Sequence, residues 1–238
     1  IAQMQRRGVR GALVTGRMYR SALPYARRLK LDAPVVCYQG AAVIDPGSDD
    51  VLLDVPLRNP EVLALVEYAR REGLHLQLYK NDRFYCERLN DWAKLYASIA
   101  GVAPVIVPSL GDEFAASDAT KAVFVAPPDI AEAHLPRIAA LLGDRAYVTR
   151  SLPEFVEVMN ANVDKGKALA IAAGHLGIEM EHVLAIGDSW NDAPLLRAVG
   201  FGVAMGSAPP ELRAAADAIV ADVANDGVAE AIERFVLS

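Results

Sequence analysis

The fold of this chain is indicated most clearly by one segment, His182-Val183-Leu184-Ala185-Ile186-Gly187-Asp188-Ser189-Trp190-Asn191-Asp192. Its apolar first half is typical of a buried strand, and a helix is expected from Asp192 to Val199, just before Gly200. Asp188 then stands at the carboxyl end of the strand, which is the edge where open α/β sheets bind ligands. A turn in which Asp192 only caps the helix would give the same pattern, so both interpretations stay open at this point.

Working outward from this segment, short apolar strands alternate with helical patterns in both directions. We expect strands at residues 11–14, 34–38, 202–205 and 218–220, and helices at residues 18–29, 167–174, 210–216 and from 227 onward. Strands that are separated by helices of roughly 8–15 residues predict a parallel sheet with right-handed crossovers. The predicted fold class is therefore α/β, with a Rossmann-like parallel-sheet core.

The middle of the chain has a different pattern. A helix is expected from Asn59 to Glu72, and residues 74–79 and 84–87 alternate with period two around a turn, as a hairpin does. Further helices at residues 90–100 and 131–142 lie among short strands. Hairpins mixed with helices predict a small α+β domain that is inserted into the α/β core. We expect the core to comprise residues 1–56 and 159–238, and the insert, or cap, to comprise residues 57–158.

The composition excludes several classes of function. The 238 residues include 24 Lys and Arg against 30 Asp and Glu, a net charge of −6, whereas a non-specific nucleic-acid binder needs a basic excess. No apolar run approaches the ~18–20 residues of a membrane-spanning helix. Cys37 and Cys86 have no metal-ligand spacing, and reduced thiols are typical of a cytoplasmic protein. We expect a monomer or a small homo-oligomer without nucleic-acid or membrane partners.

Two further segments have residue types that suit a phosphate. In Val14-Thr15-Gly16-Arg17, a strand ends in a hydroxyl and a glycine before a helix begins, and free backbone N–H groups at such a place can hold an anion. In Asp164-Lys165-Gly166-Lys167, two lysines oppose the dipole of the helix that they begin, and an anion nearby would reverse that cost. A plain cap at Thr15 and a solvated turn at residues 164–167 are the alternatives.

The three segments are more informative together. Asp188 and Asp192 alone would repel a phosphate, but a divalent cation that bridges carboxylate and phosphate oxygens removes the conflict. Oxygen ligands of this kind suit Mg²⁺. The Thr15 hydroxyl, backbone amides and a lysine then supply the remaining charge stabilisation that phosphoryl transfer requires.

With these segments in this order, the chain resembles the phosphatases of the haloacid dehalogenase superfamily, in particular the Cof type with a large α+β cap. The resemblance runs over essentially the whole chain, with the cap between the Thr15 segment and the Lys165 segment. It implies that Asp188 ligates Mg²⁺ and that Asp192 supports the metal site. It also implies catalytic roles for Thr15, Lys165 and Asp188, and contacts to the phosphoryl group from Thr15, Gly16, Lys165 and Asn191.

The chain departs from the family pattern at three places. Gln39-Gly40 stands where the family usually has Asn-Gly, and Met205-Gly206-Ser207-Ala208 stands where it usually has Met-Gly-Asn-Ala. We expect both changes to alter side-chain contacts near the site without abolishing the chemistry. The family's Asp-x-Asp-x-Thr strand end, which supplies the nucleophile and the acid/base, does not occur before Thr15. We expect it upstream of Ile1, in a strand–loop–helix unit of about 30 residues.

The resemblance therefore implies a Mg²⁺-dependent phosphatase that hydrolyses small phosphomonoesters, such as sugar phosphates or similar metabolites, through an aspartyl-phosphate intermediate. Two alternatives stay open. A non-catalytic protein of the same fold would bind a phosphorylated ligand without cleaving it, and a phosphomutase would retain the phosphoryl group instead of releasing it.

Overall fold

The structure, a computed structural model, describes all of residues 1–238 and divides them into two compact units. The first unit comprises Ile1–Thr15, Ala22–Leu53 and Asp164–Ser238, and the second comprises Gly16–Ser21 and Asp54–Val163. Each unit has its own sheets and helices, and each is described by itself below.

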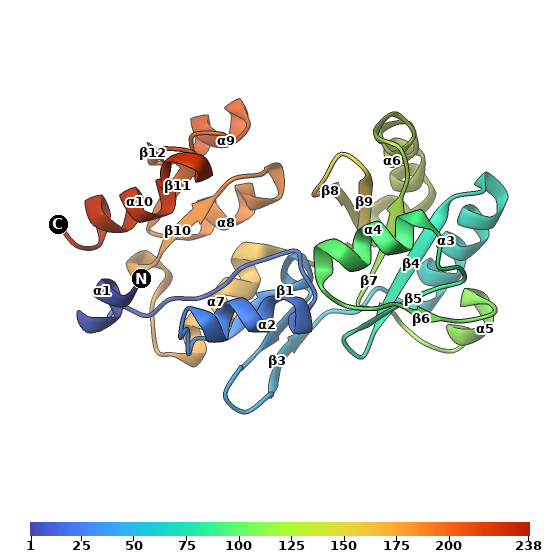
Figure 1. The fold of residues 1–238 in the computed structure, drawn as a ribbon, viewed down its shortest axis with the longest axis horizontal. Coiled ribbons are helices and arrows are strands. Elements are labelled where there is room, and N and C mark those ends of the chain that lie inside the picture. Colours follow the sequence, from blue (N-terminus) through green and yellow to red (C-terminus); the bar gives the residue numbers. More distant parts are fainter. The chain divides into compact units, whose positions relative to one another are not determined.

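The carboxyl-terminal part of the first unit is a regular alternation of strands and helices (Figure 1). Its three strands are parallel, in the order β10-β11-β12. This arrangement confirms the predicted α/β class, because a helix connects each strand to the next. The elements are β10 (Leu184–Gly187), α8 (Ala193–Ala198), β11 (Phe201–Met205), α9 (Pro210–Ala215), β12 (Ala218–Val220) and α10 (Gly227–Phe235), preceded by α7 (Lys165–His175).

The amino-terminal part of the first unit contains three short strands in the order β1-β2-β3, of which β1 and β2 are antiparallel. The strand expected at residues 11–14 is only partly present. Val14 forms a single parallel bridge with Val36, so the segment runs beside β1 without a continuous ladder. The short strands β2 and β3 were not predicted, because the sequence pattern does not indicate the tight turn after β1 in which the chain reverses direction. The elements are α1 (Ala2–Arg6), α2 (Tyr19–Arg28), β1 (Val35–Cys37), β2 (Ala42–Ile44) and β3 (Val51–Asp54).

Helix α7 lies at the centre of the first unit's core. Its buried Ala168 and Ala172 pack in one cluster with Val36 of β1 and Ala185 of β10. Small side chains let the backbone of α7 approach its neighbours closely, and the approach is closest at Gly166. A Cβ at Gly166 would lie 2.6 Å from the Cβ of Ala198 in α8 and would clash. The close contact of α7 with α8 therefore depends on glycine at this position.

The second unit is built on one six-stranded sheet in the order β6-β5-β4-β7-β9-β8. Strands β4 and β5 form the expected hairpin, in which Lys80 pairs with Arg83 across Asn81 and Asp82. Both turn residues have φ near +52°, the left-handed conformation of the turns that favour Asn and Asp. The strands are β4 (His75–Lys80), β5 (Arg83–Cys86), β6 (Val105–Ile106), β7 (Lys121–Val125), β8 (Ala146–Arg150) and β9 (Phe155–Asn160).

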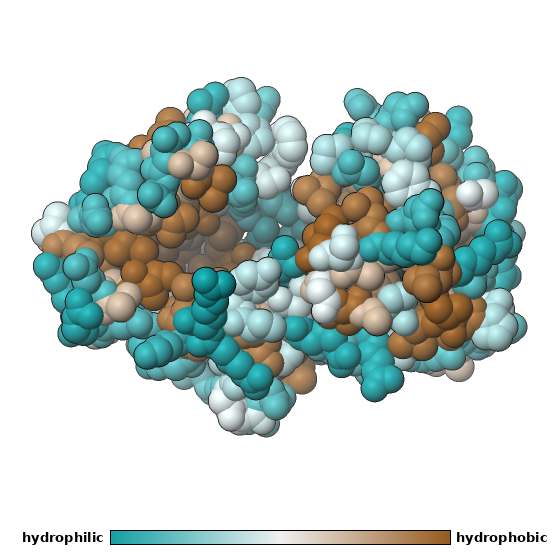
Figure 2. All heavy atoms as spheres, viewed as in Figure 1, coloured by the Kyte–Doolittle hydropathy of each residue, from teal (hydrophilic) through white to brown (hydrophobic).

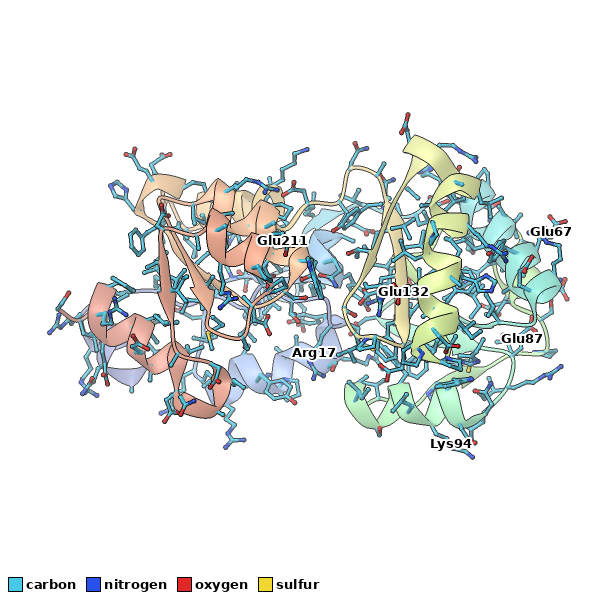
Figure 3. The ribbon with its side chains drawn as sticks, turned by 90° about the horizontal axis from the view of Figure 1, so that it is seen from above. Arg17, Glu67, Glu87, Lys94, Glu132 and Glu211 are labelled. Carbon is cyan, nitrogen blue, oxygen red and sulfur yellow. The ribbon has the colours of Figure 1, made fainter.

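Helices cover both faces of this sheet. Residues of α3 and α6 pack in one cluster with Leu78 and Phe124, whereas Tyr96 of α4 makes edge-to-face contacts with Tyr79 and Phe84, which point the other way. In Figure 3, Lys94 marks α4 and Glu132 marks α6. The helices are α3 (Asn59–Glu72), α4 (Asp91–Ala100), α5 (Leu110–Glu113) and α6 (Pro128–Leu142). No helix of the chain combines the length and the apolar character that a membrane span requires.

The second unit also buries an ion pair. Lys121 Nζ lies 2.8 Å from a carboxylate oxygen of Glu157, and both side chains are less than 5% exposed. Lys121 also donates to the carbonyl oxygen of Gly16 at 3.0 Å, and Ser151 donates to Glu157. The charges are thus paired and hydrogen-bonded, as buried charges need to be.

Candidate active site

Asp188 directly follows β10, so the strand presents its carboxylate at the carboxyl end of the parallel sheet. The preceding residue has to be small. A Cβ on Gly187 would lie 2.7 Å from the Cβ of Asp192, which comes back over the strand end through the turn. Glycine at this position therefore allows the two aspartates to lie at one point.

Asp192 organises the turn that joins β10 to α8. Its Oδ2 accepts hydrogen bonds from the backbone N–H groups of Asp188 (2.9 Å) and Ser189 (3.1 Å). The Ser189 side chain accepts in return from the backbone N–H of Asp192, which completes a capping box. The sequence left open a role for Asp192 as the cap of the following helix, but its side chain makes no capping hydrogen bond to α8. Asp192 instead closes the turn of residues 189–192, and this holds Asp188 in place.

Lys165 brings a positive charge to the same point. Its Nζ lies 2.6 Å from Asp192 Oδ1, and the lysine side chain is only 6% exposed. Asp164 caps the helix that begins at Lys165, because its Oδ1 accepts from the backbone N–H groups of Gly166 and Lys167. The carboxylate of Asp164 thus offsets the unfavourable position of two lysines at a helix N-terminus.

The charge of Asp188 is only partly compensated. Desolvation by the surrounding protein raises the pKa of the Asp188 carboxyl above its ordinary value, and the negative charge and hydrogen bonding of Asp192 raise it further. The charge of Lys165 acts in the opposite direction without cancelling these effects. Solvent still reaches Asp188, so a cation can approach its carboxylate. Such a cation would stabilise the charged form.

A chain of hydrogen bonds connects the strand end at Thr15 to the turn after β10. The backbone N–H of Thr15 donates to the carbonyl oxygen of Val36 at 2.9 Å, and the carbonyl oxygen of Thr15 accepts from the backbone N–H of Gln39 at 3.0 Å. Gln39 Oε1 in turn accepts from Asn191 Nδ2 at 3.0 Å. The Thr15 segment is thus linked to the turn that holds Asn191.

Of the residues predicted for the site, the structure places Lys165, Asp188, Asn191 and Asp192 around the turn after β10. Thr15 connects to them through Gln39, whereas Gly16 groups with the second unit. No role in the site was predicted for Gln39 or Asp164, although the change at Gln39-Gly40 was expected to alter contacts near it. The signal for Gln39 was its position directly after a strand, beside a glycine, where the resembled family has Asn.

No group of three or more His, Cys, Asp and Glu side chains in the chain is placed to hold a metal ion. Asp192 already uses both carboxylate oxygens toward protein donors, so Asp188 is the carboxylate here that is best placed to ligate a metal. One or two carboxylates suffice for Mg²⁺, because it keeps several waters and binds substrate phosphate oxygens as well. The residues present therefore fit a hard divalent cation.

Comparison with known proteins agrees with this geometry. The family model described as haloacid dehalogenase-like hydrolase matches residues 1–232. The chain belongs to the haloacid dehalogenase-like hydrolases. A solved haloacid dehalogenase-like hydrolase from Bacteroides thetaiotaomicron is 29% identical to it, with a TM-score of 0.87 over 98% of this chain and 88% of the other.

Among the relatives of this haloacid dehalogenase-like hydrolase are named phosphatases. A pyridoxal phosphate phosphatase from Escherichia coli is 26% identical over 249 residues, which cover 100% of this chain and 90% of the relative. A 5-amino-6-(5-phospho-D-ribitylamino)uracil phosphatase from Bacillus subtilis is 42% identical over 90 residues, 38% of this chain and 36% of the relative. Family membership and these relatives support phosphatase activity.

Proposed function

We propose that this protein is a Mg²⁺-dependent phosphatase that hydrolyses small phosphomonoesters, such as sugar phosphates or similar metabolites. The observation that carries the proposal is the arrangement of Lys165, Asp188 and Asp192 at the carboxyl end of β10. The ammonium group of Lys165 and the two carboxylates lie at the edge where a parallel sheet binds its ligands, and the carboxylate of Asp188 is exposed to solvent. The phosphatases among the relatives point to the same class of substrate.

In this proposal, Asp188 holds the metal ion and Asp192 supports the site by fixing the turn and orienting Lys165. Mg²⁺, when bound, supplies positive charge to the phosphoryl oxygens. Lys165 adds a second positive charge, and the Thr15 hydroxyl, the backbone of Gly16 and the Asn191 amide add hydrogen bonds to the same oxygens. Donors that are fixed before the substrate arrives stabilise the charge of the transition state without a reorganisation cost.

The proposed nucleophile is an aspartate upstream of Ile1, which attacks phosphorus, displaces the alcohol of the phosphomonoester and forms an aspartyl-phosphate intermediate that water then hydrolyses to release phosphate. Two features of the first unit support a strand there. Strand β10 pairs with β11 along one edge only, and the segment at Val14 pairs with β1 along one edge only. Val14 nevertheless packs against the core cluster that contains Ala185 of β10. Figure 2 shows hydrophobic side chains around a hollow on this unit. A strand between the two edges would complete the parallel sheet.

We further propose that the inserted domain, predicted as residues 57–158 within a core of residues 1–56 and 159–238, acts as a cap; the second compact unit contains this whole segment and extends to Asp54 and Val163, because β9 runs to Asn160. A cap of this kind selects the leaving group and excludes water until it is needed. The oligomeric state, monomer or small homo-oligomer, and the cytoplasmic location remain predictions.

The proposal is tested by release of inorganic phosphate from a panel of phosphomonoesters that includes sugar phosphates, pyridoxal phosphate and phosphoglycolate, with and without Mg²⁺. Metal-dependent release supports it. Transfer of the phosphoryl group within a substrate, without release, would indicate a phosphomutase. Saturable binding of these esters with neither release nor transfer would indicate a non-catalytic binding protein. Either result would overturn the phosphatase proposal.

Asp188→Asn tests the metal-binding role directly. We expect Mg²⁺ affinity in calorimetry to fall by at least about tenfold, and phosphate release to fall with it, because an anionic ligand has been replaced by a neutral one. The matched control is Asp32→Asn, since Asp32 is an exposed aspartate of the same unit, paired only with Arg10. Unchanged Mg²⁺ affinity in Asp188→Asn would remove Asp188 from the metal site.

A further inference from the structure

The turn after β1 has an unusual backbone. Tyr38, Gln39 and Gly40 have φ angles of +52°, +62° and +97°, so three consecutive residues lie in the left-handed region. For a residue with a side chain this conformation costs roughly 1–2 kcal/mol. Such strain persists only where the surroundings enforce it, and it concentrates at functional sites.

The surroundings of this turn belong to the candidate site. A Cβ on Gly40 would lie 2.7 Å from the carbonyl oxygen of Asp164 and 3.0 Å from the backbone nitrogen of Lys165. The turn is therefore pressed against the beginning of α7, where Lys165 starts. On its other side, the backbone N–H of Gln39 donates to Thr15.

The side chain of Gln39 is buried, and the NH₂ group of its amide makes no hydrogen bond. The side chain is 2% exposed, and its Oε1 accepts from Asn191 Nδ2 at 3.0 Å. Its Nε2 has no acceptor, and it is the only buried side-chain nitrogen or oxygen of the chain without a hydrogen-bond partner. Leaving a buried donor without an acceptor costs about 1–3 kcal/mol. A strained turn that places a costly free donor among site residues needs a reason beyond folding.

We propose that Gln39 is a substrate-binding residue whose Nε2 donates a hydrogen bond to an oxygen of the phosphoryl group. The inference rests on the proposed function. Gln39 is hydrogen-bonded to Thr15 and Asn191, and the adjacent Gly40 packs against the backbone at Lys165. These three residues are the ones proposed to hold the phosphoryl group, and a phosphoryl oxygen is the acceptor that the Nε2 lacks. The Oε1 of the same amide meanwhile holds the Asn191 side chain in one orientation. Gln39 thus acts on the ligand itself and also orients a second donor.

The test measures binding of orthovanadate, a phosphoryl mimic, to the full-length protein by calorimetry. In Gln39→Met, which keeps the length of the side chain but removes its polar atoms, the vanadate Kd should rise by about 10–100-fold, as for one lost hydrogen bond to a charged group. The melting temperature should stay the same or rise, because an unsatisfied buried donor has been removed. A vanadate Kd within twofold of the wild-type value would overturn the inference.

A matched control is available in the second unit. Gln77 is also fully buried, but its Oε1 accepts from Tyr79 and its Nε2 is bonded to His75. Gln77→Met should lower the melting temperature and leave the vanadate Kd unchanged. If Gln39→Met behaves in this way, Gln39 is a structural residue and the inference is wrong.

Direct contact with the ligand is separated from action through Asn191 by a double-mutant cycle. In an Asn191→Ala background, Gln39→Met should still weaken vanadate binding by at least about fivefold, because the lost donor is its own. No further loss in that background would mean that Gln39 acts only by orienting Asn191, which overturns the inference. Gln39→Glu, which retains the shape, replaces Gln39→Met if the latter does not fold.

The two proposals fail in different ways. If vanadate binding depends on Gln39 but no phosphomonoester is hydrolysed, the phosphatase proposal is wrong and the role of Gln39 in anion binding stands. If phosphomonoesters are hydrolysed and vanadate binding is indifferent to Gln39, only the inference on Gln39 is wrong.

Discussion

Asp192 shows how one residue can make its neighbour available for chemistry. Its two carboxylate oxygens receive hydrogen bonds from Lys165 and from the backbone N–H groups of Asp188 and Ser189. These bonds fix the turn, and they leave Asp188 as the carboxylate that can face a ligand. The two aspartates therefore differ in their contacts: Asp192 is fully used in hydrogen bonds within the protein, and Asp188 is open to solvent.

Lys165 pairs with Asp192 and is also proposed to contact the phosphoryl group. We therefore expect Lys165→Ala to lower both the stability of the protein and its affinity for anions. Removing the lysine leaves Asp192 buried without its cationic partner, and breaking a buried pair in this way costs about 3–5 kcal/mol. The free energy of unfolding in urea should fall by an amount near the lower end of that range, because two backbone donors to Asp192 remain. The vanadate Kd should rise by at least about 100-fold, since a charge and its hydrogen bond are lost.

Lys167→Ala is the control, because Lys167 lies two residues further along the same helix and is exposed. It should change neither the urea midpoint nor the vanadate Kd. If Lys165→Ala and Lys167→Ala raise the vanadate Kd equally, the lysines attract anions only through the overall positive charge at the helix N-terminus, and Lys165 makes no specific contact.

At the scale of elements, the site depends on how closely α7 approaches α8. Lys165 begins α7, and the turn that carries Asp188 and Asp192 leads into α8. The two helices meet at Gly166, where a Cβ would lie 2.8 Å from the carbonyl oxygen of Pro194 as well as 2.6 Å from the Cβ of Ala198. The distance between Lys165 and Asp192 is therefore set by helix packing.

Gly166→Ala should separate the two helices. We expect it to lower the free energy of unfolding by about 1–3 kcal/mol, the usual cost of overpacking, and to weaken vanadate binding through the Lys165–Asp192 pair. Gly174→Ala is the matched control in the same helix, since nothing lies within 4 Å of a Cβ there. It should raise stability by up to about 1 kcal/mol, because alanine favours a helix more than glycine does. Urea unfolding of both variants measures the difference, and a stable Gly166→Ala variant would contradict the close contact.

At the scale of the whole molecule, stability should depend on pH through a histidine of the second unit. His75 lies at the start of β4, with Gln77 and Asn90 within hydrogen-bond distance of its two ring nitrogens. Burial lowers the pKa of His75 to about 4. Because the ordinary value is 6.5, the unfolded chain takes up a proton between pH 6.5 and pH 4 that the folded chain does not. The contribution of His75 to stability is therefore complete above pH 6.5 and is lost as the pH falls.

Between pH 7 and pH 5, the free energy of unfolding should fall by an amount on the order of 1 kcal/mol because of His75, after allowing for the partial exposure of its ring. Thermal unfolding of the wild type and of His75→Gln over this range measures it, and the variant should show the weaker dependence on pH. His182→Gln serves as the control, because the His182 side chain is 71% exposed. Parallel curves for wild type and His75→Gln would contradict the prediction.

Local patterns were enough to predict the α/β class, the helices and hairpin of the middle segment, and the position of Asp188 at a strand end, because hydrophobic periodicity and turn residues reflect contacts between residues close in the chain. The family resemblance that the motifs indicated was confirmed. Tertiary structure alone decided which side chains share a hydrogen bond across distant elements. Gln39 and Asn191 are 152 positions apart, and Lys165 and Asp192 are 27 apart. The single bridge at Val14 and the strands β2 and β3 were likewise decided by packing. Such pairings depend on how closely helices and strands that are distant in the sequence pack together in the core, and no local sequence pattern encodes the distance between them.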